Sequence, residues 1–300
     1  MANSTDQLPL PTYDDITVVV PAPGEGVGNW AGAASAVLVD GVFWLTWRER
    51  RPLTDGRGVA VHIARSRDGV HFDEVAQVLR EDFGAESFER PVLVPVPGIG
   101  WRLYLSCATP GSKHWWVDTL TAPSPETIAT GERRITLTGD RRTAVKDPVI
   151  RALPDGGWEM YLCCHPLDEP GHEDRMTSRR LTSVDGLEWV DHGEVLAGRP
   201  GAWDERGARV TTVIADEPLT VLYDGRPDAA SNWYEQTGVA VWDGERFVAH
   251  DADPLGSPYG EGALRYACAV PLPDGSTRFY IEAARPDGAH DLVTLVSNAR

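Results

Sequence analysis

"WRLYLS", residues 101–106, is one of five short apolar and aromatic runs that resemble one another along the chain. The other four are VFWLTW from Val42, WEMYLC from Trp158, LTVLYD from Leu219 and TRFYIE from Thr277. Their starts are separated by 59, 57, 61 and 58 residues. A nearly constant period of this length over a whole chain indicates a repeat architecture, in which each repeat is one supersecondary unit.

Hairpin signals surround these runs. Four of the five follow another apolar run and a turn, as in PVLVPVPGIG, PVIRALPDGG, VTTVIADEP and YACAVPLPDGS. Pro, Asp and Gly supply the backbone dihedral angles that a tight hairpin needs. An aspartate-glycine turn before an aromatic residue follows 24 to 27 residues after the start of three of the runs, at Asp68, Asp185 and Asp243. Each unit is therefore predicted to contain four antiparallel strands.

Five such units predict an all-β fold, a five-bladed β-propeller with four antiparallel strands per blade and a single domain over residues 1–300. The fifth unit is one strand short, whereas the strand-like DITVVV at residues 15–20 precedes the first unit. We expect this N-terminal strand to close the last blade, because a closed ring leaves no unpaired edge. A tandem of β-sandwiches is the alternative, although sandwiches do not require a constant period. The expected blades span approximately residues 27–83, 84–140, 141–200, 201–256, and 257–300 plus the strand 15–20.

The charge balance argues against two classes of partner. Lys and Arg number 28 against 45 Asp and Glu, which gives a formal net charge of −17 at pH 7. Such a chain has no basic footprint for nucleic acid or for an anionic membrane surface. The sequence does not begin with a positively charged segment and an apolar stretch, and no run approaches the roughly 18 apolar residues of a membrane helix. We therefore expect a soluble cytoplasmic protein with neither partner.

The spacing of the four cysteines and eight histidines predicts neither a bound metal ion nor a cofactor. Cys163 and Cys164 are adjacent, would point to opposite faces of a strand and lack C-x-x-C spacing, so we expect reduced core residues. The segment HPLDEPGHEDR, residues 165–175, has a metal-like composition. We interpret it as a solvated hairpin loop or as a lid over the channel mouth.

Functional residues are expected where the innermost strands of the blades begin. In a propeller these strands start at one face of the central channel, so residues that are distant in sequence converge there. The corresponding positions carry carboxylates, basic groups and aromatic rings. They are Trp30 in the first unit, Glu89 and Arg90 in the second, Lys146 and Asp147 in the third, Arg209 in the fourth, and Glu261, Arg265 and Tyr266 in the fifth.

Four features of the chain belong together: the period, the KDP motif at 146–148, the S-x-DG-x-x-[WF] turns and YGEGA around Glu261. With these features the chain resembles, in a divergent form, the five-bladed β-propeller glycoside hydrolases of family 43 and the related family 32. In those enzymes three acids at the funnel mouth serve as general base, as orienting and pKa-setting aspartate, and as general acid. The resemblance implies that Asp147 is the orienting aspartate, with Lys146 in place of the arginine of the family's RDP motif. It also implies that Glu261 is the general acid, with Ala263 in place of the proline of the EGP motif.

One departure from the family concerns the general base. The first-blade aspartate is absent near NWAGAAS, where Asn29 and Trp30 stand and Glu25 is the nearest acid. Glycoside hydrolysis needs two carboxyl groups, roughly 6.5 to 9.5 Å apart when a water molecule must fit between them. Glu89, together with an acid from another blade, is therefore the candidate base or a binding group.

These residues also have structural interpretations. An acid before a proline at a strand start, such as Asp147, often only ends pairing or caps a turn. Arg209 and Arg265 would either bind an anionic or polyhydroxylated ligand or pair with acids across the channel; pairing is favoured because unmatched charges would otherwise be buried.

The tryptophans fall into two groups. Five lie off the repeat period: Trp30, Trp115, Trp116, Trp203 and Trp233. Trp30 and Trp203 are expected to stack on a sugar ring at the mouth, and the role of the other three stays open, because large aromatic residues also fill gaps between blades. Five others recur in strand register and are expected in the core: Trp44, Trp101, Trp158, Trp189 and Trp242.

The sequence and the resemblance together predict a glycosidase-like protein that binds a small carbohydrate or glycoside and hydrolyses it. The alternatives are a binding protein without hydrolysis or a propeller with a different reaction, which the missing first-blade acid favours, and a protein-interaction scaffold. The expected catalytic residues are Asp147, Glu261 and Glu89, and the expected substrate-binding residues are Trp30, Arg90, Trp203, Arg209, Arg265 and Tyr266.

Overall fold

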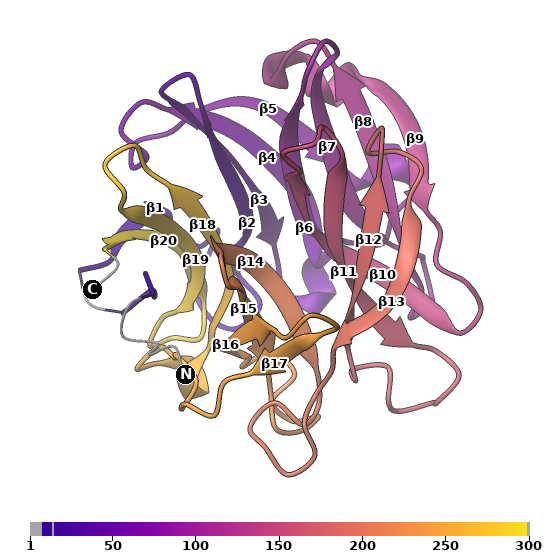
Figure 1. Ribbon diagram of the computed structural model, residues 1–300, viewed down its shortest axis with the longest axis vertical. Coiled ribbons are helices and arrows are strands. Elements are labelled where there is room, and N and C mark those ends of the chain that lie inside the picture. The colour runs from indigo at the N-terminus through magenta and orange to yellow at the C-terminus, as the bar shows by residue number, and fades with distance from the viewer. Residues whose placement is uncertain (1–7, 14, 299–300) are drawn as a thin grey trace.

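The computed structural model describes residues 8–13 and 15–298, which form almost only β-strands and connecting turns (Figure 1). Three sheets in this part of the chain each hold four antiparallel strands in chain order. The first contains β6 (Phe88–Val96), β7 (Gly100–Ala108), β8 (Trp115–Ala122) and β9 (Glu132–Leu137). The next contains β10 (Thr143–Ala152), β11 (Trp158–Pro166), β12 (Thr177–Ser183) and β13 (Val190–Leu196). The third contains β14 (Ala208–Asp216), β15 (Leu219–Gly225), β16 (Gln236–Trp242) and β17 (Phe247–Ala249).

The remaining described strands form an eight-stranded sheet made of two runs of four. One run holds β2 (Trp30–Val39), β3 (Val42–Arg50), β4 (Gly58–Ser66) and β5 (Asp73–Leu79). The other holds β18 (Leu264–Pro271), β19 (Thr277–Ala284), β20 (His290–Ser297) and β1 (Thr17–Val20). The runs meet where Trp30 pairs in parallel with His290.

The N-terminal strand pairs with the last strand of the chain, as the sequence predicts. Thr17 of β1 lies opposite Thr294 of β20 in an antiparallel ladder, and the two strands lie side by side in Figure 1. β1 therefore supplies the fourth strand that the fifth unit lacks.

Short 3-10 helices connect some of the strands: η2 (Leu53–Asp55), η3 (Arg80–Phe83), η4 (Pro125–Thr130) and η5 (Gly260–Gly262). No helix in the described part of the chain is long and apolar enough to cross a membrane. All four cysteines are buried and unbridged.

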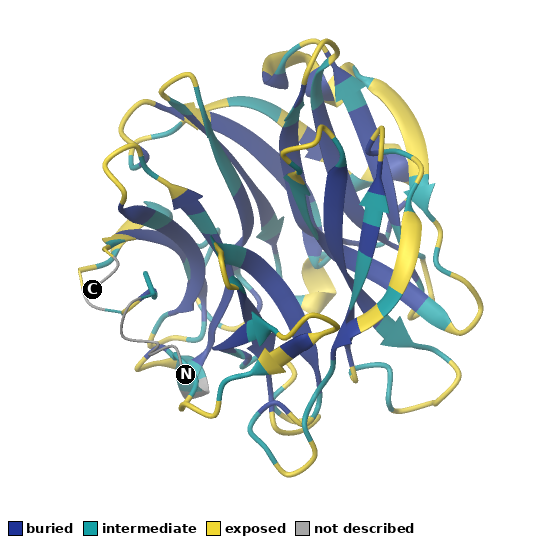
Figure 2. Cartoon of the chain, viewed as in Figure 1, coloured by how far each residue is buried: buried dark blue, intermediate teal, exposed yellow. Residues whose placement is uncertain are grey.

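Apolar side chains pack between neighbouring sheets. Trp44 of β3 and Leu103 of β7 belong to one buried cluster, and Tyr104 of β7 and Met160 of β11 belong to another. The inner strands are buried, whereas β9 and β13 at the outer edges are largely exposed (Figure 2). The five tryptophans predicted in the core do lie in or against these clusters.

The aspartate-glycine turns have a structural role. Ser66 Oγ accepts a hydrogen bond from the Gly69 N–H at 2.9 Å, and Asp68 Oδ1 accepts one from the Val70 N–H at 2.8 Å. Ser183 and Asp185 repeat this arrangement in the third unit. The S-x-DG motif is thus a local turn lock, because the short side chains satisfy backbone donors that no strand pairs.

The first strand of every unit is interrupted by a bulge. The ladder register shifts between Gly32 and Ser35, Phe88 and Pro91, Lys146 and Val149, Val210 and Thr212, and Arg265 and Cys268. A bulge leaves residues out of the ladder and re-aims their side chains. At three of these bulges a residue other than glycine has positive φ: Ala33 at 51°, Asp147 at 50° and Tyr266 at 54°. A residue other than glycine with positive φ costs about 1–3 kcal/mol, and such residues are concentrated at functional sites. The bulges therefore indicate a functional site at the centre of the molecule.

Candidate binding site

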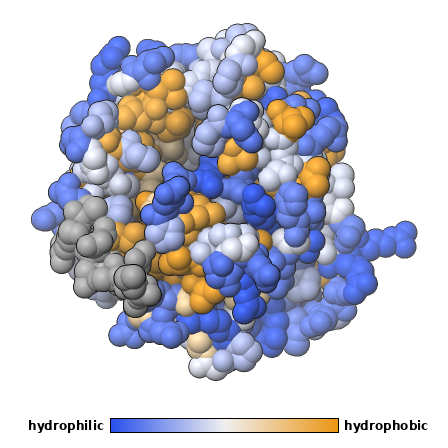
Figure 3. Space-filling view, viewed as in Figure 1, coloured by the Kyte–Doolittle hydropathy of each residue, from blue (hydrophilic) through white to orange (hydrophobic). Residues whose placement is uncertain are grey.

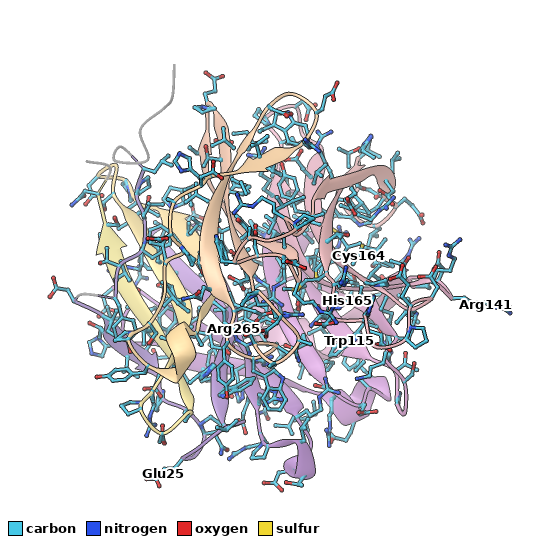
Figure 4. The ribbon with its side chains drawn as sticks, turned by 90° about the horizontal axis from the view of Figure 1, so that it is seen from below. Glu25, Trp115, Arg141, Cys164, His165 and Arg265 are labelled. Atoms are coloured by element: carbon cyan, nitrogen blue, oxygen red, sulfur yellow. The ribbon has the colours of Figure 1, made fainter. Side chains whose placement is uncertain are left out.

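A cavity of about 330 Å³ collects side chains from the inner strands of all five units. Figure 4 shows three of its lining residues, Trp115, His165 and Arg265, near the centre of the molecule, whereas Glu25 lies at the periphery. The first-strand residues at the cavity are Trp30, Glu89, Lys146, Arg209, Arg265 and Tyr266, and Arg50 stands at the end of the second strand of the first unit. His165, Glu173 and Asp174 also line it, so the 165–175 segment borders the cavity.

The cavity wall carries more positive than negative side chains, although the whole chain has a net charge of −17. Its acids are Glu89, Glu173, Asp174 and Glu235. Its basic residues are Arg50, Arg57, Lys113, Lys146, Arg209, Arg226 and Arg265. The lining therefore has a net charge of opposite sign to that of the whole chain.

Most of the buried charges form one continuous network. Arg48 bridges Glu89 and Glu282, with 2.9 Å between its Nη2 and Glu282 Oε2. Arg265 connects Glu282 to Glu235, at 2.8 and 2.7 Å. The Arg48–Glu89 pair joins β3 to β6 of a neighbouring sheet, and the Arg48–Glu282 pair joins the two runs of the eight-stranded sheet. The Arg265–Glu235 pair joins β18 to the connection before β16, so the pairs align these segments as well as matching the charges. The predicted pairing of Arg209 and Arg265 with acids is present.

Arg209 is the most highly connected member of this network. Its guanidinium lies 3.1 Å from Asp147 Oδ2, 2.8 Å from Asp224 Oδ2 and 3.3 Å from Glu235 Oε2. It also covers the Tyr266 ring, at 3.9 Å from the ring centroid. One cation thus holds three carboxylates together.

Asp147 lies beneath the cavity and is not one of its lining residues. It is completely buried, and its Oδ1 accepts a hydrogen bond from the Arg90 N–H at 3.1 Å. Its Oδ2 is 3.3 Å from Lys146 Nζ and 3.1 Å from Arg209 Nη1. This carboxylate can orient its neighbours, and it has no direct access to the cavity.

The Tyr266 hydroxyl links the two acids that the sequence singles out. It lies 3.2 Å from Glu89 Oε2 and 3.3 Å from Asp147 Oδ2, and it accepts a hydrogen bond from Arg209 Nη1 at 2.9 Å. A phenol has a single proton and therefore donates to one carboxylate at a time. Burial raises the pKa of Tyr266 well above its usual value, so the hydroxyl stays protonated.

The two inner carboxylates at the cavity are ionised. Burial alone would raise the pKa of Glu89, but the nearby Arg48 and Lys146 lower it below its ordinary range. Burial has the same tendency at Glu235, where Arg209 and Arg265 nevertheless lower the pKa to about 2. Both groups can accept a proton or a hydrogen bond, and neither is a proton donor at neutral pH.

A third carboxyl, Asp224, differs. Burial, only partly offset by Arg209, raises the pKa of Asp224 to about 6. Its Oδ2 accepts the Tyr266 N–H at 2.9 Å, and the residue does not line the cavity. Asp224 is therefore mostly ionised at neutral pH, paired with Arg209, and takes up a proton as the pH falls through about 6.

Trp30 has little free surface for a sugar ring. It is 2% exposed, stacks on His290 at 4.5 Å, and carries the guanidinium groups of Arg50 and Arg265 at 4.0 and 4.6 Å from its ring centroid. Trp203 stacks on Tyr223 at 5.6 Å and does not line the cavity.

Two other tryptophans from loops and outer strands, Trp115 and Trp233, do line it. Trp115 lies under Lys146 Nζ, which is 4.9 Å from its ring centroid. Trp233 is half-buried and packs edge-on against Trp30 at 5.7 Å. Their rings are the aromatic surfaces at the cavity that the sequence analysis left unassigned.

Arg90 and Glu261 are the remaining predicted residues. The Arg90 guanidinium donates to the Thr211 carbonyl oxygen at 2.7 Å and does not line the cavity. Glu261 belongs to η5, and its side chain lies outside the described residues. Ala33 stands at the first-strand bulge, so the corresponding point of the first unit carries a methyl group. No group of three His, Cys, Asp or Glu side chains in the described part of the chain is arranged to hold a metal ion.

Several residues of the site were not predicted from the sequence. Arg48, Asp224 and Glu282 lie on second strands, opposite the residue that precedes or adjoins the bulge. Their signal was a polar residue at the end of an otherwise apolar run, as in LTVLYD and TRFYIE. Glu235 and Arg226 carry no such periodic signal because they lie in connections outside the strands.

Comparisons with known proteins establish the fold class. No protein-family model matches the chain, and no curated protein matches it by sequence. Solved structures do match. A thermostable family-43 glycoside hydrolase is 17% identical, with 90% of each chain covered and a TM-score of 0.66. The β-1,2-mannobiose phosphorylase from Listeria innocua, solved with β-1,2-mannobiose, is 15% identical, with 98% of this chain and 95% of that chain covered and a TM-score of 0.66.

A third similar structure is the α-L-arabinofuranosidase from Fusarium graminearum, solved with an iminosugar inhibitor. It is 14% identical, with 94% of this chain and 97% of that chain covered and a TM-score of 0.59. The chain therefore has a glycoside hydrolase-like β-propeller fold, in the divergent form that the sequence predicts. At these identities the likeness concerns the fold, and activity has to be argued from the site.

Proposed function

We propose that the chain is a single-domain, five-bladed propeller that binds a small carbohydrate in its central cavity. The observation that carries this proposal is the cavity itself: fixed charged donors and acceptors from all five units stand beside two indole rings. Sugars are bound by this combination, because hydroxyl groups need directed hydrogen bonds and the apolar ring face needs an aromatic surface. The similar structures include two that hold a mannobiose and an iminosugar inhibitor.

The blade count and the ring closure belong to this proposal. They are supported by five first-strand bulges and by the pairing of β1 with β20. In the proposed ring, β1 is the outer strand of the fifth blade, and the domain spans the whole described chain.

We assign ligand binding to charged residues of the cavity wall and to one tryptophan. Glu89 and Glu235 are ionised acceptors, and Lys146, Arg209 and Arg265 are donors. The buried ion pairs hold these groups in place before a ligand arrives, which lowers the entropic cost of binding. Trp233 supplies the aromatic surface.

Binding is tested by calorimetry against a panel of mono- and disaccharides, with Trp233→Ala as the site variant. Trp116→Ala is the control, because Trp116 is half-buried, stands next to Trp115 and does not line the cavity. We expect Trp233→Ala to weaken binding about tenfold, since aromatic contacts with a ligand are worth on the order of 1 kcal/mol. A panel without any binder, or equal losses in both variants, would contradict the proposal.

Cleavage of a glycosidic bond in the same cavity is a second candidate function. It is favoured by the contact of the Tyr266 hydroxyl with Glu89, which places a protonated group 3.2 Å from an ionised carboxylate at the cavity. Glu89 would accept a proton from water or attack the anomeric carbon. Because Glu89 and Glu235 hold no proton, the leaving group would be protonated by Tyr266, whose hydroxyl would regain a proton from Glu89 after that carboxylate has taken one from water.

This candidate is tested with aryl α-L-arabinofuranoside, β-D-xyloside and β-fructoside. Glu89→Gln and Tyr266→Phe should each remove turnover and retain binding of the unreacted sugar. Turnover that survives in Glu89→Gln would refute the assignment. Binding without turnover in the unmodified protein would refute cleavage and support binding as the function of the cavity.

A further inference from the structure

One buried guanidinium at the cavity lacks the partner that its neighbours have. Arg50 is 4% exposed, and in the described part of the chain no carboxylate oxygen lies within 4.0 Å of it. Its single hydrogen bond there runs from Nη1 to the Gly28 carbonyl oxygen at a long 3.3 Å. Arg48 and Arg265, the nearest cations, each contact two carboxylates.

The position of Arg50 is fixed by aromatic rings. Its guanidinium carbon lies 4.0 Å from the Trp30 ring centroid and 5.1 Å from that of Trp233. Stacking uses the face of the guanidinium and leaves its N–H edge for a ligand. Burial, reinforced by Arg48 and Arg265, lowers the pKa of Arg50 to about 9, so it stays charged at neutral pH and its charge is poorly compensated.

We propose that Arg50 binds the carboxylate of an acidic sugar, which makes a uronate-type saccharide the ligand class of the cavity. This assignment rests on the proposed carbohydrate-binding function and names its substrate class. A planar carboxylate matches the guanidinium edge through two parallel hydrogen bonds. Binding it would also give Arg50 the counter-charge that it lacks.

The charge balance selects a carboxylate over phosphate. A carboxylate has a single negative charge and neutralises Arg50. A phosphate group has a charge of about −1.5 to −2 at pH 7, which exceeds the single unpaired charge of Arg50. The net charge of −17 does not prevent anion binding, because exposed charges are screened beyond about 8 Å at physiological ionic strength.

The test compares sugar pairs that differ in the carboxylate. Calorimetry with D-glucuronate and D-glucose, and with D-galacturonate and D-galactose, measures the preference for the acid. We expect at least one uronate to bind the unmodified protein about tenfold or more tightly than its neutral counterpart, as charged hydrogen bonds of this kind allow. Arg50→Gln should abolish that preference, and Arg50→Lys should retain part of it.

Arg51→Gln is the matched control. Arg51 is the next residue, pairs with Glu49 at 2.8 Å and does not line the cavity. The control should keep the full preference for the uronate. Equal binding of acid and neutral sugars, or an unchanged preference in Arg50→Gln, would overturn the inference and leave carbohydrate binding intact. Failure of every sugar to bind would overturn the proposed function as well.

Thermal unfolding provides a readout that does not require knowing the preferred sugar. Arg50→Gln removes an uncompensated buried charge, so its melting temperature should equal or exceed that of the unmodified protein. A drop of about 6 °C or more, the size expected when a buried ion pair is broken, would show that Arg50 already has a charged partner and would refute the inference. Galacturonate or glucuronate should raise the melting temperature of the unmodified protein and of Arg51→Gln more than that of Arg50→Gln. An equal rise with inorganic phosphate would refute the choice of a carboxylate.

Discussion

Replacing Arg209 with leucine tests whether the central ion network holds the sheets together. The substitution removes a buried cation that lies within 3.3 Å of carboxylate oxygens from Asp147, Asp224 and Glu235. Removing one partner of a buried ion pair costs about 3–5 kcal/mol, because the charge left behind is neither paired nor hydrated. Because three carboxylates share this cation, we expect Arg209→Leu to lie in the upper part of that range at neutral pH.

The cost should depend on pH in a definite direction. The pKa of Asp224 is already raised to about 6, and without Arg209 it rises further. A carboxyl whose pKa is higher in the folded than in the unfolded protein binds more protons when folded, so stability falls as the pH rises. The loss in Arg209→Leu should therefore be smaller at pH 5.5 than at pH 8.

The assay is calorimetric unfolding of both proteins at these two pH values. At about 2 °C per kcal/mol for a chain of this size, the upper part of that range corresponds to a fall in melting temperature of about 8–10 °C at pH 8. Arg142→Leu is the control: Arg142 pairs with Asp168, but its side chain is 79% exposed, and such pairs contribute about 0–1 kcal/mol. Equal effects of the two variants, or a loss that does not change with pH, would refute the reasoning.

Three further predictions concern other parts of the fold. His62 lies 3.2 Å from Glu49 and 3.0 Å from Glu74. Burial opposes the protonation of His62, but these two carboxylates raise its pKa. The stabilising effect of protonated His62 should therefore be present at pH 5.5 and lost as the pH rises through the raised pKa. His62→Gln should reduce this pH dependence of the melting temperature, and an unchanged profile would contradict it. Gly32→Ala would place a Cβ 2.1 Å from Glu282 Oε2, so it should destabilise the protein by several kcal/mol in denaturant unfolding; normal stability would show that Glu282 can move. Deleting residues 1–20 removes the partner of β20, and unfolding or aggregation should follow in light scattering and melting experiments; an unchanged melting temperature would refute ring closure by β1.

The protein surface bears on the alternative of an interaction scaffold. On the face shown in Figure 3, hydrophobic residues gather in separate patches among hydrophilic ones. The exposed large hydrophobic residues, among them Val184 and Val190, are scattered over several strands and turns. The cavity is therefore the better-supported site.

The sequence by itself determined the strand units, their order and the core. Strand alternation, hairpin turns and the lock around Asp68 depend on residues close together in the chain, so a repeat of 57 to 61 residues was enough to predict the four-stranded sheets and the fold class. It also placed Glu89, Asp147, Arg209, Arg265 and Tyr266 among the residues of the central network.

Only the tertiary structure decided which of these charges face the cavity and which are paired. Arg48 meets Glu282 across 234 positions of sequence, and no local pattern specifies such a contact. Asp147 is buried below the cavity, whereas Glu89 lines it, although both stand beside a proline-containing strand start. Arg50 and Arg48 lie two positions apart on one strand, yet Arg48 pairs with two carboxylates and Arg50 contacts only a carbonyl oxygen. Pairing depends on which side chains the neighbouring strands bring within reach.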